Sequence, residues 1–380
     1  MKRSPGVGIK LLTVMMAIGI AGGLSWYTLD QKKEAENLSA QGTKAASFVD
    51  SSTTDTQEEN PIADIKNAKK SSESLYTKLS KKEPVRIAVL GDTFGVSSGA
   101  SEGHEWDTVL KDTLEKNYGS DVTVDNFAVA VTTAFQGYCT VKQNKWDDYD
   151  LAIVCFGSMD QNGEIGTFQR DYESIIRGLR RANAQMVIMP MVSTYVSDSN
   201  FSGTVRDIAS QYGLTCVNMN NAFVDSGKSE DELTTDGVYP NDDGYALYAN
   251  AIAVAIDQNI QSGVTASTKK VSAQYDGVKE MDKFKFISAD DLTYVSDNQY
   301  SYTGDATVLG ISYEPASSGS DSIAIEVNGY TYKTIDCVTS YDLDKTHYAI
   351  GAVDLSEDDT VTITVNSDSG VKFNGITVSR

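Results

Sequence analysis

The sequence predicts an α/β domain with a parallel sheet, an all-β module after it and a membrane helix before it. From residue 83 to about 262, short apolar runs bounded by Gly, Asp or Asn alternate with segments of helical period, as in doubly wound sheets. Beyond about residue 270 the helical period stops, and apolar and polar residues alternate one by one. An uncharged run over residues 11–29 precedes both regions.

The prediction for residues 83–262 depends on five apolar runs and on the helical segments between them. The runs are "VRIAVLGD", "DVTVDNFAVA", "YDLAIVCFG", "QMVIMPM" and "LTCVNMN". Apolar residues recur at helical spacing over residues 106–114, 165–179, 205–212 and 245–260. Asn241 or Asp242 can cap the last of these helices. In open sheets of this kind, ligands bind outside the carboxyl ends of the strands.

Residues 270–380 are predicted to form a β-sandwich-like module. Segments such as "SIAIEVNGYTYKTI" and "DTVTITV" have the alternation of half-buried strands, and Asn328-Gly329 and Asn374-Gly375 are predicted as hairpin turns. The module contains nine of the chain's 20 tyrosines. Such a surface is compatible with carbohydrate binding, but tyrosine is also simply a good strand residue.

The N-terminal run is predicted to be an uncleaved transmembrane signal anchor. Residues 11–29 are long enough to cross a bilayer, and Lys2, Arg3 and Lys10 before them favour a cytoplasmic N-terminus. A cleaved signal peptide is the alternative, although its apolar region would be shorter and no clear A-x-A site is present. In both cases the remainder is exported. Residues 30–82 are predicted to be a polar, partly helical spacer.

Charge and composition exclude several classes of partner. The net charge of −21 argues against binding nucleic acid. The chain has four cysteines without a CxxC pair and only two histidines, so we expect no metal site of Cys and His ligands. No cofactor-binding motif is identified.

Four blocks in the α/β region carry a resemblance to a known family. They are "VLGDTFG", "NFAVAVTTA" and "FGSMD", each after a predicted strand, and "DGVYPNDDGY" before the last helix. In this order they resemble the SGNH (GDSL-type) hydrolase family, over about half of the chain. The resemblance implies a flavodoxin-like, doubly wound, five-stranded parallel sheet. It also implies acyl-ester hydrolysis or transfer.

The residues that the family uses for catalysis are mostly replaced. The resemblance places Thr93 at the serine nucleophile, Val131 at the oxyanion-hole glycine, Met159 at the oxyanion-hole asparagine and Tyr239 at the histidine base. Asp236 alone keeps the expected residue type. The surrounding glycines, Asp, Pro and Asn residues that shape the loops are retained.

These replacements predict a degenerate catalytic centre. Thr93 can attack an ester only if a base takes its proton, and tyrosine, with a pKa of about 10, is a poor base near neutral pH. Met159 donates no hydrogen bond, and losing one oxyanion donor typically costs about 10²–10³ in kcat. A shift of the second block by one residue would put Thr132 at the glycine position instead of Val131.

His104, Tyr239 and Met159 each have two alternative roles at this catalytic centre. His104, eleven residues after Thr93, is a possible relocated base, or else a solvent-facing residue at a helix start. His347, the other histidine, is expected on the surface of a strand. Tyr239 and Met159 either fill a disused pocket or line a reshaped cleft, in which the tyrosine ring could pack against a sugar.

The sequence therefore predicts a membrane-anchored, extracytoplasmic protein with an inactive esterase-like domain. Its expected role is to bind or organise cell-envelope polysaccharide. One alternative is an active carbohydrate O-acyl esterase or acyltransferase with a rearranged nucleophile and base. Another is a structural partner of envelope proteins that binds no ligand.

Overall fold

The structure is a computed structural model that describes residues 74–196, 199–266 and 271–380. The predicted membrane helix over residues 11–29 and most of the predicted spacer lie outside the described residues. No helix in the described part combines the length and the apolar character that crossing a bilayer requires.

The α/β domain contains one parallel sheet with the strand order β2-β1-β3-β4-β5, which is the flavodoxin-like order. Each of the five apolar runs forms a strand, so the predicted doubly wound sheet is confirmed. The strands are β1 (Val85–Gly91), β2 (Val122–Asn126), β3 (Leu151–Cys155), β4 (Val187–Val192) and β5 (Val217–Asn218). Every residue of β3 and β4 is buried, because helices cover both faces, and this explains their unbroken apolar sequence.

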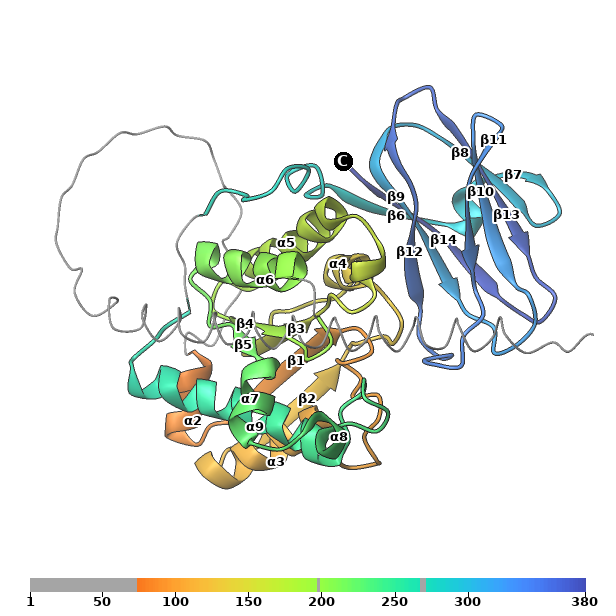
Figure 1. Ribbon diagram of the computed structural model, residues 1–380. Helices are drawn as coiled ribbons and strands as arrows, with labels where there is room; N and C mark the ends of the chain where they lie inside the picture. Colours follow the sequence, from red (N-terminus) through yellow and green to blue (C-terminus); the bar gives the residue numbers. More distant parts are fainter. Residues whose placement is uncertain (1–73, 197–198, 267–270) are drawn as a thin grey trace, which may run out of the picture. The chain divides into compact units, whose positions relative to one another are not determined.

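Helices form a layer on each face of this sheet (Figure 1). One layer contains α2 (Leu75–Lys81), α3 (Trp106–Tyr118), α7 (Met219–Ser226), α8 (Glu230–Leu233) and α9 (Asp242–Gln261). The other contains α4 (Ala134–Gln143), α5 (Ile165–Ala182) and α6 (Ser199–Tyr212), and a short 3₁₀ turn, η1 (Asp160–Asn162), follows β3. Two apolar clusters, one under each layer, form the core of the domain.

Two helix starts bear on the predicted boundaries. Asn241 caps α9, since its side-chain oxygen accepts a hydrogen bond from the Gly244 N–H at 3.0 Å. Helix α2 lies within the segment predicted as spacer, yet Leu75 and Leu79 are fully buried in the core beside α9. The packed α/β unit therefore begins N-terminal of residue 83.

Helix α4 has no counterpart among the predicted helical segments. Its residues from Ala134 to Val141 are all buried, because the sheet covers one side and the β module the other. The Tyr138 hydroxyl bonds to the Met281 carbonyl at 2.7 Å and to the Ser379 hydroxyl at 2.8 Å. A helix buried on both sides shows no apolar stripe, so periodicity could not reveal it.

The β module consists of two antiparallel sheets that share one apolar core. One sheet has the order β11-β10-β13-β8-β7 and the other β12-β9-β14-β6. The elements are β6 (Phe284–Ser288), η2 (Ala289–Asp291), β7 (Thr293–Ser296), β8 (Gln299–Thr303), β9 (Ala306–Glu314), β10 (Ser322–Val327), β11 (Tyr330–Asp336), β12 (His347–Leu355), β13 (Thr360–Asn366) and β14 (Lys372–Ser379). Strands β10 and β13 bury alternate residues towards this core, as the alternation predicted, whereas β9 in the other sheet is buried along most of its length.

The two Asn-Gly pairs have different roles. Asn328 and Gly329 join β10 to β11 with φ values of 53° and 79°, as a tight hairpin turn requires, so this turn is confirmed. The hairpin prediction for Asn374-Gly375 is wrong, because both residues lie inside β14 at a bulge. A Cβ at Gly375 would lie 2.2 Å from a carbonyl oxygen of β6, so a close backbone approach requires this glycine.

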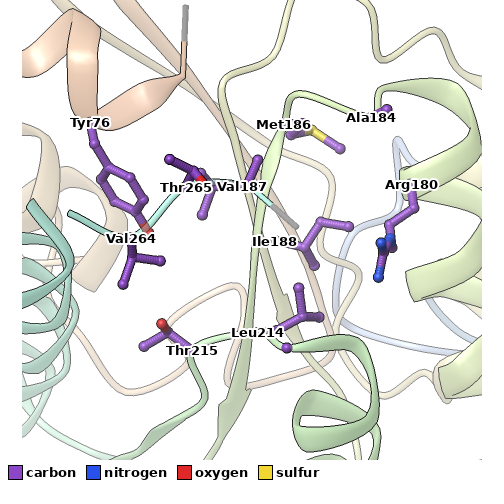
Figure 2. A pocket seen from close by; sticks show the side chains of 12 residues that line it. Tyr76, Arg180, Ala184, Met186, Val187, Ile188, Leu214, Thr215, Val264 and Thr265 are labelled. Carbon is purple, nitrogen blue, oxygen red and sulfur yellow. The ribbon is translucent and has the colours of Figure 1, made fainter. Parts of the chain in front are cut away.

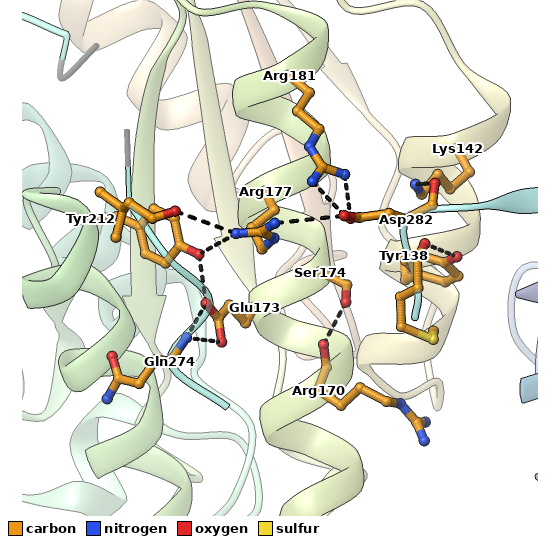
Figure 3. A network of polar contacts seen from close by, with 12 residues as sticks. Tyr138, Lys142, Arg170, Glu173, Ser174, Arg177, Arg181, Tyr212, Gln274 and Asp282 are labelled. Atoms are coloured by element: carbon orange, nitrogen blue, oxygen red, sulfur yellow. Dashed lines mark hydrogen bonds and ion pairs between the residues drawn. The ribbon is translucent and has the colours of Figure 1, made fainter. Parts of the chain in front are cut away.

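A buried polar network attaches the connection between the two domains to α5 (Figure 3). The Glu173 carboxylate, fully buried, accepts hydrogen bonds from the Gln274 N–H at 2.8 Å and from the Tyr212 hydroxyl. Arg177 lies between Tyr212 and Asp282 and contacts both. Residues 271–283 are thus held against the α/β domain.

We expect Leu75→Ala to destabilise the α/β domain by about 2–4 kcal/mol, because it removes a fully buried side chain from the core between α2 and α9. Thr77→Ala, an exposed change on the same helix, is the matched control and should shift stability by less than about 0.5 kcal/mol. Urea unfolding of both variants is the measurement. Equal stability of the two would show that α2 does not belong to the folded unit.

Candidate active site

Four loops of the α/β domain meet at the carboxyl end of the parallel sheet. The loop after β1 contacts the loop after β3 through Asp92 and Ser158, and it contacts the loop after β2 through Thr93 and Val131. The turn before α9 joins them through the ring of Tyr239, which packs against the loop after β1. These contacts bring together the four blocks that resemble a hydrolase.

The carboxylate of Asp92 holds the first of these loops against the third. Asp92 is buried, and one carboxylate oxygen accepts a hydrogen bond from the Phe94 N–H at 3.1 Å. The other oxygen accepts from the N–H and the hydroxyl of Ser158, at 2.9 and 2.7 Å. Burial raises the pKa of Asp92 to about 6, although the hydrogen bonds from Ser158 oppose this shift. Asp92 therefore fixes the backbone on both sides of the site.

Thr93, at the predicted nucleophile position, is buried, and its hydroxyl faces the loop after β2. The Val131 N–H donates a hydrogen bond to Thr93 Oγ1 at 2.9 Å. This places an N–H of the second block next to the threonine hydroxyl. In the described part of the chain, no carboxylate or imidazole makes a hydrogen bond to that hydroxyl.

Val131 has a backbone conformation that favours glycine. Its φ is +59°, in the left-handed region where a β-branched residue is a rare outlier. Its side chain is 44% exposed, so packing of the valine does not account for the conformation. Thr132, the alternative for the glycine position, is not among the residues with positive φ. Strain at a loop beside the predicted nucleophile is typical of functional sites.

Met159 and Asp160 follow β3 at the start of the η1 turn. Met159 is half-buried, and its thioether donates no hydrogen bond. Both carboxylate oxygens of Asp160 accept from the Ala134 N–H, at 3.0 and 3.1 Å, at the first turn of α4. Burial raises the pKa of Asp160 well above its usual range. Asp160 thus connects the third block to α4.

Asp236 and Tyr239 lie in the turn before α9. Asp236 is exposed, and one of its carboxylate oxygens accepts from the N–H groups of Tyr239 and Val238, at 2.9 and 3.0 Å. These backbone donors lower the pKa of Asp236. Burial, and then the nearby Tyr341, raise the pKa of Tyr239. Asp236 therefore shapes the turn, and Tyr239 stays protonated near neutral pH.

Aromatic rings surround the predicted nucleophile. Phe94, buried, has the rings of Tyr195 and Tyr239 on it, each with its centroid 5.7 Å away. Tyr195 is 44% exposed and follows β4, while Tyr341 is 47% exposed and comes from the β module. Neither Tyr195 nor Tyr341 belongs to a sequence block that predicted the site. A position just after the fourth predicted strand was the only available signal for Tyr195, and Tyr341 had none.

The two histidines lie away from Thr93. His104 is exposed in the turn before α3, and no hydrogen bond joins it to Thr93. The expectation of a surface position for His347 is wrong, because His347 is 5% exposed and stacks near the Tyr313 ring. Its Nε2 lies 3.3 Å from the Asp342 carbonyl oxygen, and burial lowers its pKa. Neither imidazole is therefore placed to accept the Thr93 proton.

Neither of two hollows in the described part of the chain is lined by Thr93, Val131 or Tyr239. Within residues 74–196, 199–266 and 271–380, no three His, Cys, Asp or Glu side chains are grouped to hold a metal ion. A cavity of about 20 Å³, on the order of one water molecule, lies near the start of β4, at the opposite end of the strand from the site (Figure 2). An open depression beside the Tyr239 turn is lined by Gly99, Ser101, Thr235, Asn241, Asp242 and Asp243.

Comparison with known proteins agrees with the resemblance of these four blocks. Residues 89–247 match the model of the GDSL-like Lipase/Acylhydrolase family. An acetylxylan esterase from Xylanibacter ruminicola is 23% identical over 219 residues, which cover 46% of this chain and 44% of the esterase. The chain thus matches less than half the length of that relative.

A solved structure resembles both domains together. A two-domain esterase (CEX) active on acetylated mannans covers 80% of this chain and 93% of its own, with a TM-score of 0.61 and 16% identity. The same esterase co-crystallised with mannopentaose gives a TM-score of 0.61 and 16% identity over 80% of this chain and 92% of its own. At this identity the similarity shows a shared fold alone. The chain therefore shares the two-domain fold of this esterase.

We expect Val131→Gly to leave the protein as stable as the wild type or up to about 1 kcal/mol more stable, because it relieves a left-handed valine. Val254→Gly is the matched control, since Val254 is also 44% exposed but lies in α9. There glycine should cost about 0.5–1 kcal/mol. Urea unfolding measures both, and an equal loss of stability in the two variants would argue against strain at Val131.

Asp92 should make stability depend on pH. Because its pKa is raised above the unfolded value of 3.8 to about 6, its contribution is fully present below pH 3.8 and is lost as pH rises through 6. The wild type should therefore gain about 1.4 kcal/mol over Asp92→Asn between pH 7.5 and pH 5. Urea unfolding of both proteins at the two pH values tests this. A constant difference between them would show that Asp92 does not titrate in this range.

Proposed function

We propose that this chain is an exported, membrane-anchored polysaccharide-binding protein built on a carbohydrate-esterase scaffold, and that it does not hydrolyse esters. The anchor is the segment of residues 11–29. One observation carries the proposal of inactivity: the Thr93 hydroxyl accepts a hydrogen bond from the Val131 N–H, and no carboxylate or imidazole among the described residues is hydrogen-bonded to it. The residue at the family's histidine position is Tyr239.

The absence of a base decides the chemistry. A threonine hydroxyl attacks an ester only when a neighbouring group takes its proton. Tyr239 cannot do so near neutral pH, because it is already protonated and its raised pKa keeps it so. Asp236, the family's partner of the histidine, binds backbone N–H groups of its own turn instead. The histidine that would connect Asp236 to Thr93 in the family's catalytic relay is therefore replaced by Tyr239.

A carbohydrate ligand is supported by the aromatic rings that pack on Phe94 and by the relatives. Tyr195 and Tyr239 flank Phe94, and Tyr195 has nearly half of its surface exposed. An apolar sugar face packs well on such rings while the phenol hydroxyl forms hydrogen bonds. The two relatives described above are an acetylxylan esterase and an esterase active on acetylated mannans. An acetylated plant-type or envelope polysaccharide is the ligand class that fits both observations.

An active carbohydrate O-acyl esterase or acyltransferase is the second candidate. It is favoured by the activity of the relatives and by the Val131 N–H beside Thr93, which could stabilise an anion if it turned from Thr93 Oγ1 to the substrate. It requires a base from elsewhere. His104 is the available histidine on this domain, and its turn would have to move for its side chain to contact Thr93.

Binding and turnover of acetylated xylan and acetylated mannan by the purified full-length chain decide between the candidates. We expect no acetate release above buffer, and we expect Tyr239→Ala or Tyr195→Ala to weaken binding about tenfold, which is 1.4 kcal/mol. Tyr332→Ala is the matched control, because this tyrosine is 48% exposed on β11 of the β module.

Each other outcome points to a different conclusion. Acetate release that disappears in Thr93→Ala or His104→Ala would establish the second candidate and refute inactivity. Affinity lost in Tyr332→Ala and retained in Tyr239→Ala would move the binding site to the β module. Absence of binding by the wild type to either polysaccharide would refute the ligand class.

A further inference from the structure

The loop between β11 and β12 of the β module forms hydrogen bonds with the loop that carries Val131. Asp342 Oδ2 accepts a hydrogen bond from the Ala130 N–H at 2.7 Å. Lys345 Nζ donates to the Ala128 carbonyl oxygen at 2.6 Å, and it pairs with Asp342 at 3.0 Å. One acidic and one basic side chain of the β module thus bind a donor and an acceptor on the backbone just before Val131.

Both sides of this contact hold an unfavourable backbone conformation. Val131 has a φ of +59° and Asp342 a φ of +47°, and neither is glycine. Left-handed residues of this kind cost about 1–3 kcal/mol and persist only where surrounding contacts determine them. Within the α/β domain the loop is held by the hydrogen bond from the Val129 N–H to the Gly91 carbonyl at 3.0 Å and by that from the Thr132 hydroxyl to the Val129 carbonyl at 2.6 Å. The β module adds its two bonds to the backbone just before Val131.

The loop between β11 and β12 is itself held by hydrogen bonds where it joins β12. The Gln136 side chain of α4 donates to the Thr346 carbonyl at 3.1 Å and accepts from the Tyr348 N–H at 2.7 Å. The buried His347 ring contacts the Asp342 carbonyl oxygen from within the β module. Because the loop between β11 and β12 is anchored in this way, it can hold the Val131 loop in one conformation.

We propose that Asp342 and Lys345 are positioning residues that keep the Val131 N–H directed at Thr93 Oγ1, so that this polar pair of the α/β domain is complete only with the β module in place. The same loop carries Tyr341, which contributes to the raised pKa of Tyr239. Loss of the contacts made by Asp342 and Lys345 therefore disturbs the polar pair at Thr93. The effect on ligand affinity rests on the proposed polysaccharide binding, whereas the effect on the loop does not.

A positioning role of Asp342 can be distinguished from a role in packing the two domains together. Tyr138 and Ser379 form a hydrogen bond across the same interface at 2.8 Å, but in the middle of α4 and away from the Val131 loop. A docking role predicts that losing either contact loosens the interface in the same way. A positioning role predicts that only the loss of Asp342 changes the backbone around Val131.

Hydrogen–deuterium exchange of the full-length chain, read by mass spectrometry over residues 127–133, tests the proposal. We expect Asp342→Ala to accelerate exchange there at least tenfold while β1 and β3 remain protected. Asp342→Asn, whose amide oxygen can still accept from Ala130, should restore most of the protection. Ser379→Ala is the matched control and should leave this segment unchanged.

Binding of acetylated xylan gives the second measurement. We expect Asp342→Ala to weaken it at least fivefold, with Asp342→Asn close to the wild type. Unchanged exchange over residues 127–133 in Asp342→Ala, or equal acceleration in Ser379→Ala, would overturn the proposal. If the wild type binds no polysaccharide, the proposed function fails, while the exchange result still decides the role of Asp342.

Discussion

The burial of α4 on both sides is the constraint on which the arrangement of the site depends. One side packs on the sheet so closely that a Cβ at Gly137 would lie 2.4 Å from the Phe156 ring. The other side packs on β9, where a Cβ at Gly310 would lie 2.6 Å from the Phe135 ring. Two glycines thus allow one helix to serve both domains. Because α4 begins directly after the Val131 loop, fixing the helix fixes one end of that loop.

The site follows from this constraint and from two buried carboxylates. Asp160 accepts from the first turn of α4, and Asp92 accepts from the loops after β1 and β3. The four loops are therefore held together by hydrogen bonds to backbone N–H groups. These bonds do not depend on the side chains of Thr93 and Tyr239.

Much of this architecture was readable in the sequence because it depends on local patterns. Strands buried on both faces leave unbroken apolar runs, and Asn241 is a good cap wherever a helix begins. The block order placed Thr93 and Met159 correctly after their strands, since strand ends and loops alternate along the chain. Local patterns also have limits: Asn328-Gly329 and Asn374-Gly375 are the same dipeptide, but only the first forms a turn.

By itself, the sequence determined the strands of the α/β domain and its four longest helices, α3, α5, α6 and α9, because short-range periodicity is a property of the chain alone. Only the tertiary structure decided the rest. It buried α4 and His347, brought Tyr195 beside Phe94, and placed Asp342 of the β module on Ala130, 212 residues away in the chain. Contacts between segments so distant leave no periodic signal, because packing of one domain on the other selects them.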